Sequence, residues 1–125
     1  MKKKYAILLF VALTFAACNK STDIPQFEES DWQSDKNGCQ GLRSAMIEQL
    51  EQAKGSLKGL SEDEISSLLG KPDRNELYKR NQKFFIYDIK GSKSCEAQDP
   101  TTTYTYLSIR FNATGLAKEV LIYTN

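Results

Sequence analysis

The stretch from Leu57 to Asp73 constrains the fold most, because it marks both ends of a short helix. Ser61 can accept a hydrogen bond from the backbone N–H of Glu64, and the Glu64 side chain can return to the N–H of Ser61, which is a capping box. Gly70 suits the end of a helix, and Pro72 prevents the helix from resuming. So short a helix is not stable alone. Its apolar residues must therefore pack against a larger unit: Ile65, Leu68 and Leu69.

A longer helix is expected just before this one. From Gln40 to Lys54, apolar residues recur at spacings of three and four, with polar residues between them, which is typical of an amphipathic helix. Gly55 is expected to end it. Gly55, Gly59 and the cap at Ser61 disfavour one continuous helix through the region, so two helices are predicted.

Beyond Pro72 the sequence is rich in aromatic and β-branched residues, which are typical of strands. A short strand is expected at 76–79 and stronger strands at 83–89, 103–111 and 117–123. Alternation in the last two puts one set of residues on the core face: Leu107, Ile109, Phe111, Val120 and Ile122. The predicted fold is α+β, with two N-terminal helices packed on one face of a three- to four-stranded antiparallel sheet.

The N-terminus has the features of a secretory signal. Three lysines precede an apolar run from Tyr5 to Ala17, which is shorter than the roughly 20 residues of a membrane-spanning helix. Phe15 to Cys18 resembles a bacterial lipobox, so residues 1–17 are predicted to be removed and Cys18 to be acylated. The alternative is an ordinary signal peptide with Cys18 left as a free thiol.

A flexible tether is expected after the anchor, over residues 18–38, because this region is polar and acidic and contains Pro25. Phe27 and Trp32 are its exceptions. We expect one or both to pack on the domain; the alternative is a linear motif that a partner binds. A single α+β domain is then predicted for residues 39–125.

The two remaining cysteines, Cys39 and Cys95, form an even pair in a chain that is predicted to be exported. They are expected to form a disulfide. The alternative, a redox or nucleophilic thiol, usually needs a histidine or a Cys-x-x-Cys motif. The chain contains neither.

Composition excludes several classes of function. The chain has 17 basic and 16 acidic residues, so nothing suggests binding to nucleic acid. It has no histidine and no recognisable nucleophile or metal set, so no enzyme activity, metal or cofactor is expected.

The polar side of the 103–111 strand carries the candidate binding residues. Tyr104, Tyr106 and Arg110 alternate with the core-facing set, and tyrosine and arginine are enriched at protein interfaces. The alternative explanation is the ordinary β-propensity of tyrosine.

The sequence from Leu57 to Asp73, followed by the aromatic strand with Phe85-Ile86-Tyr87, resembles the SmpA/OmlA (BamE) lipoproteins and the wider β-lactamase-inhibitor-protein-like domains. Leu60 and Ser61 stand where that family has Met and Thr. The resemblance implies two helices on an antiparallel sheet and a non-catalytic, lipid-anchored protein that binds other envelope proteins.

The expected function is therefore that of a cell-envelope lipoprotein, anchored in the outer rather than the inner membrane, with its domain in the periplasm or at the cell surface. It would act as a protein-interaction module in outer-membrane assembly or maintenance and bind another envelope protein. The alternative is an inhibitor-like module that occludes an enzyme or ligand site.

Overall fold

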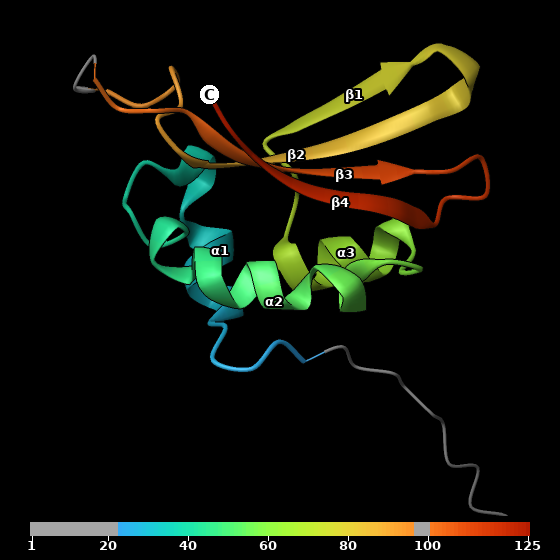
Figure 1. Ribbon diagram of the computed structural model, residues 1–125, viewed down its shortest axis with the longest axis horizontal. Helices are drawn as coiled ribbons and strands as arrows, with labels where there is room; N and C mark the ends of the chain where they lie inside the picture. The colour runs from blue at the N-terminus through green and yellow to red at the C-terminus, as the bar shows by residue number, and fades with distance from the viewer. Residues whose placement is uncertain (1–22, 97–100) are drawn as a thin grey trace, which may run out of the picture.

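The structure is a computed structural model that describes residues 23–96 and 101–125 (Figure 1). The predicted signal peptide and the predicted acylation site, Cys18, lie outside these residues. Three α-helices precede four strands: α1 (Glu29–Ser34), α2 (Ile47–Leu57), α3 (Glu62–Leu69), β1 (Arg74–Tyr78), β2 (Gln82–Lys90), β3 (Thr105–Phe111) and β4 (Ala117–Thr124). In the two described ranges, no helix is long and apolar enough to span a membrane.

The four strands form one antiparallel sheet in the order β1-β2-β3-β4. The helices cover one face of this sheet, and the opposite face is free of them (Figure 1). The α+β class and the antiparallel sheet are as predicted.

The core lies between the sheet and the helices. Side chains at alternate positions of the strands form one wall of the core, and the apolar side chains on one side of α2 and α3 form the other. Its fully buried members include Leu50, Leu57, Ile65, Leu69, Tyr87, Ile89, Leu107 and Ile109. Phe111 and Val120 are also buried as predicted, and Ile122 packs partly buried against the core.

Helix α3 and its capping box are confirmed. Ser61 Oγ accepts from the N–H of Glu64 at 3.2 Å, and the Glu64 carboxylate accepts from the N–H of Ser61 at 3.0 Å. Gly70 follows with a φ of +77°, and a Cβ there would lie 2.8 Å from Cγ of Gln33 in α1. The sequence after α3 therefore needs glycine both for its conformation and for close packing.

The helix predicted from Gln40 to Lys54 is wrong at both ends. Helix α2 begins at Ile47 and runs through Gly55 to Leu57. It starts late because the backbone N–H groups of Gln40 and Arg43 donate to the buried carboxylate of Asp35, at 2.7 and 3.0 Å. This contact and a short 3₁₀-helix, Ser44–Met46, occupy the residues before α2.

The segment predicted as a flexible tether folds onto the domain from Ile24 onward. It forms α1 and a short 3₁₀-helix, Lys36–Gly38. Trp32 is fully buried, and Phe27 packs against it with ring centroids 5.5 Å apart. Both Phe27 and Trp32 therefore pack on the domain, as expected, and a few apolar side chains hold this otherwise polar segment against it.

The Cys39–Cys95 disulfide is confirmed, with the Cα atoms 5.4 Å apart. It ties the loop after β2 to the residue that follows the 3₁₀-helix Lys36–Gly38, and the residues after Cys39 form turns before α2 begins.

Candidate functional site

The outer sheet face, the side of the sheet away from the helices, carries a continuous set of aromatic and apolar side chains. Strand register places Ile86 of β2 beside Ser108 of β3, and Ser108 beside Leu121 of β4. Tyr106 of β3 pairs with Tyr123 of β4 in the same way. These side chains share a face because alternate residues of a strand point to the same side.

Three tyrosines stack in a row on this face. The ring centroids of Tyr104 and Tyr106 are 5.0 Å apart, and those of Tyr106 and Tyr123 are 5.4 Å apart. A second aromatic pair, Tyr78 and Phe84, lies near the free edge of the sheet with centroids 5.0 Å apart. The side chain of Tyr123 remains 44% exposed, and that of Tyr78 remains 60% exposed.

A groove of about 460 Å³ lies between the two aromatic groups. Ile86 and Ser108 are among its most buried residues. The residues around the groove come from all four strands, together with Tyr104 just before β3 and Asn125 just after β4: Arg74, Glu76, Tyr78, Phe84, Ile86, Tyr104, Tyr106, Ser108, Tyr123 and Asn125.

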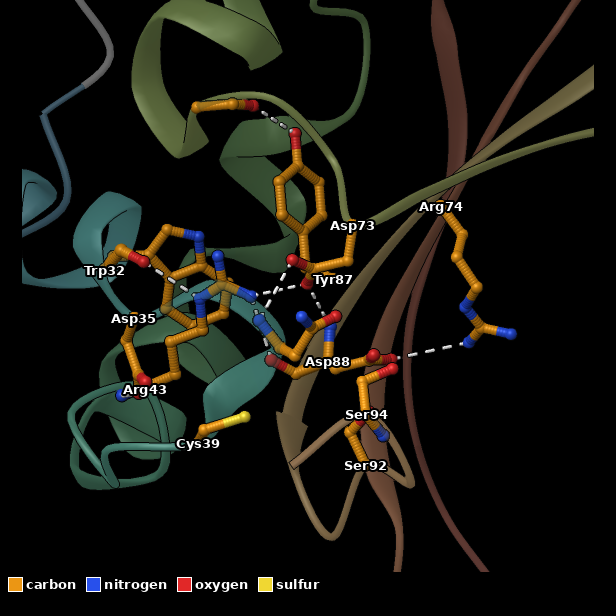
Figure 2. Close-up of polar contacts among 12 residues, drawn as sticks. Trp32, Asp35, Cys39, Arg43, Asp73, Arg74, Tyr87, Asp88, Ser92 and Ser94 are labelled. Carbon is orange, nitrogen blue, oxygen red and sulfur yellow. Dashed lines mark hydrogen bonds and ion pairs between the residues drawn. The ribbon is translucent and has the colours of Figure 1, made fainter. Parts of the chain in front are cut away.

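One end of the groove is fixed by a polar cluster of Arg74, Asp88 and Tyr104. The Tyr104 hydroxyl donates a short hydrogen bond to Oδ1 of Asp88 and accepts one from Nη2 of Arg74 at 2.5 Å. Arg74 Nη2 also lies 3.4 Å from the Asp88 carboxylate, as Figure 2 shows. Burial, and then the hydrogen bond to Asp88, raise the pKa of Tyr104 above its usual value, so the phenol stays protonated and Tyr104 is held in place.

A second cavity, also of about 460 Å³, lies beside the groove. Its walls come from the loop after β2 and from the ends of β1 and β2. Arg74, Tyr104 and Asn125 line both hollows, so the contact between Arg74 and Tyr104 lies where the two meet.

Behind this region lies a buried polar network centred on Arg43 (Figure 2). The Arg43 guanidinium donates to the carbonyl of Trp32 at 2.8 Å, to the carbonyl of Asp88 at 2.9 Å and to the carboxylate of Asp73 at 2.6 Å. It also lies 4.9 Å from the ring centroid of Trp32, a cation–π distance. The Arg43 and Asp73 charges pair with each other, and the network links α1 and the start of β1 to β2.

Of the predicted binding residues Tyr104, Tyr106 and Arg110, the two tyrosines lie together at the groove. Arg110 lies on the same face but does not line the groove, and its guanidinium is 3.8 Å from the carboxylate of Glu119 in β4. The prediction missed Arg74 and Phe84, which come from other strands. Their outward positions would follow from period-two alternation only once the strand register is known.

Among the residues at 23–96 and 101–125, no group of three or more cysteine, aspartate or glutamate side chains could hold a metal ion. No protein-family model, curated protein or solved structure matches the chain. Fold and site together define a small, disulfide-linked α+β domain with an aromatic sheet face that none of the described helices covers.

Proposed function

We propose that this chain is a lipid-anchored cell-envelope protein, held in the outer membrane through Cys18, that acts as a non-catalytic interaction module. Its outer sheet face would bind another envelope protein. The observation that carries this proposal is the aromatic groove, which crosses the sheet on the face that the helices leave uncovered.

The residues around the groove suit a protein partner. Tyr106, Tyr123 and Phe84 offer large rings that are already held by stacking and cross-strand contacts, so binding would order few additional side chains. Aromatic and arginine side chains contribute much of the energy at protein interfaces. A polar rim is present as well, supplied by Arg74, Glu76 and Asn125.

The position of the segment before α1 also supports binding through the outer sheet face. The segment before α1 runs below the helical layer, on the side opposite the outer sheet face (Figure 1). An anchor at Cys18, five residues before the first described residue in the sequence, would join the domain to the membrane through this segment and not through the outer sheet face.

A non-catalytic role agrees with the chemistry of the groove. The phenol of Tyr104 stays protonated, and the Asp88 carboxylate is 4% exposed and already accepts from Tyr104 and Arg74. Neither group is free to act as a base or nucleophile. A role in outer-membrane assembly or maintenance is proposed from the resemblance to the SmpA/OmlA (BamE) lipoproteins.

An inhibitor-like module is the second candidate, and the β1–β2 hairpin favours it. This hairpin extends beyond the helical layer (Figure 1), and near its tip the side chain of Leu77 is 77% exposed. A protruding hairpin with an exposed leucine could enter the cleft of an enzyme.

Affinity capture from detergent-solubilised envelopes separates the two candidates. Under the first, the Tyr106→Ala/Tyr123→Ala variant should recover at least tenfold less partner than wild type, since losing two interface anchors costs more than about 1.4 kcal/mol. Leu77→Ala should recover as much as wild type. Under the second, Leu77→Ala loses a single soluble enzyme and the tyrosine variant retains it. Unchanged recovery with both variants would contradict both assignments.

The anchor has a separate test. Cys18→Ser should abolish incorporation of labelled fatty acid and release the protein from the membrane fraction. A Cys18→Ser protein that still incorporates the label would refute acylation at this position.

A further inference from the structure

The Cys39–Cys95 disulfide follows directly on the part of the loop after β2 that lines the cavity beside the groove, and neither cysteine is a buried residue. Cys39 is exposed, and Cys95 is partly exposed. The loop that carries Cys95 supplies part of the cavity wall through Gly91, Ser92, Lys93 and Ser94.

The two segments that the disulfide joins are held differently. On the Cys39 side, the N–H of Asn37 donates to the Asp73 carboxylate at 3.0 Å, and Gly38 lies so close to β2 that a Cβ there would be 2.2 Å from the carbonyl oxygen of Ile89. On the other side, Cys95 N–H donates within its own loop, to the carbonyl of Ser92 at 3.1 Å. The Cys95 sulfur joins this loop to the segment at the short 3₁₀-helix through the disulfide to Cys39, and it lies 3.6 Å from the carbonyl oxygen of Asn37.

The first residue of the same loop, Gly91, passes close to the backbone of Thr103 and Tyr104. Gly91 has a φ of +73°, and a Cβ there would lie 2.3 Å from the carbonyl oxygen of Thr103 and 2.9 Å from Cα of Tyr104. Tyr104 in turn stacks on Tyr106 and bonds to Asp88. A continuous series of contacts therefore runs from the disulfide to the first ring of the stacked tyrosine row.

We propose that the disulfide is a redox clasp for the outer sheet face. Oxidised, it holds the loop at residues 91–96 against Thr103 and Tyr104 and keeps the end of the groove ordered. Reduced, it frees this loop and loosens Tyr104 while the rest of the domain stays folded. The inference rests on the proposed function, because it describes regulation of the same face.

The reductant is a dithiol. One of its thiolates attacks Sγ of the exposed Cys39, the S–S bond breaks, and Cys95 leaves as a thiolate that takes up a proton. The second thiol of the reductant then displaces Cys39 from the mixed disulfide. Two electrons and two protons pass to the protein, and the reductant ends as a cyclic disulfide.

The domain stays folded because its core and its buried network do not depend on this bond. Arg43 joins α1, β1 and β2 through Trp32, Asp73 and Asp88. None of the described residues that form the core lies in the 91–96 loop.

Hydrogen–deuterium exchange of the purified full-length protein tests the clasp without needing a partner. We compare the oxidised protein with the dithiothreitol-reduced protein and with Cys39→Ser/Cys95→Ser. Exchange in peptides covering 91–96 and 103–106 should rise at least tenfold in both altered forms. Exchange in peptides covering 62–69 and 107–111 should stay within about twofold of the oxidised value. Near-ultraviolet circular dichroism should lose part of the signal of the stacked tyrosines.

Three outcomes would overturn the proposal. A rise in exchange of similar size in every peptide would show that the disulfide stabilises the whole domain and not the loop in particular. Unchanged exchange in every peptide would show that the disulfide does not order the loop. A rise in 91–96 alone would break the link to Tyr104. All three concern the isolated protein, so they are distinguishable from a failure of the outer sheet face to bind a partner.

Discussion

Nη1 of Arg43 lies 2.6 Å from Oδ2 of Asp73, and the two side chains are only 1% and 5% exposed. Two residues thirty positions apart thus form an ion pair inside the domain. The Asp73 carboxylate also accepts from the N–H groups of Asn37 and Asp88, which connects the N-terminal segment to the sheet.

Arg43→Met should destabilise the domain by about 3 to 5 kcal/mol, because it leaves the Asp73 carboxylate buried without its cation. Urea unfolding followed by circular dichroism measures this loss. Lys54→Ala is the matched control, since it breaks the partly exposed pair with Glu51 and should cost no more than about 0.5 kcal/mol. Equal losses in the free energy of unfolding of the two variants would show that the buried Arg43–Asp73 pair stabilises the domain no more than a surface ion pair does.

Two glycines should respond to alanine in opposite directions. Gly38→Ala should cost about 2 kcal/mol or more, because it strains a φ of +66° and drives a Cβ into the carbonyl of Ile89. Gly55→Ala should stabilise by about 0.5 to 1 kcal/mol, since Gly55 lies inside α2 with open space around it. Thermal unfolding of both variants checks the signs, and a gain at Gly38 would contradict the close packing described above.

Tyr87 should make the domain sensitive to alkali. Its side chain is fully buried and donates to the carbonyl of Gly70 at 2.8 Å, and burial raises its pKa well above the ordinary tyrosine value of about 10. The folded state therefore keeps a proton that the unfolded state loses above pH 10. Stability from this group is fully present below that pH and falls by about 1.4 kcal/mol per pH unit above it.

Tyr87→Phe should remove that part of the alkaline slope, while costing about 1 kcal/mol at neutral pH through the lost hydrogen bond. Urea unfolding between pH 9 and pH 11 measures both effects. Ile89→Val, which changes a buried side chain that has no titratable proton, should keep the wild-type slope. If Tyr87→Phe also kept it, Tyr87 would not be the group responsible.

The parts of the fold that follow from local patterns could be predicted from the sequence. Helix α3 was predictable because Ser61, Glu64 and Gly70 lie within ten residues of one another, and their interactions are local. Strands β3 and β4 were predictable because alternation in a half-buried strand is visible along the chain itself.

The parts that depend on distant partners could not be predicted. Packing of Trp32 on the domain was expected, but nothing near Trp32 in the sequence indicates that its partner is Tyr87, with ring centroids 6.2 Å apart. The network of Arg43 with Asp73 and Asp88 is likewise formed by residues from separate segments. The groove needed strand register to bring Phe84 and Arg74 beside the tyrosines.

Site-specific photo-cross-linking in living cells tests the central claim most directly. A benzophenone amino acid replaces Tyr106 in the groove, or Gln52 on the exposed side of α2 as the matched control. The account predicts a light-dependent adduct with an envelope protein from position 106 and none from position 52. Adducts from position 52 alone, or equally from both positions, would contradict binding through the outer sheet face.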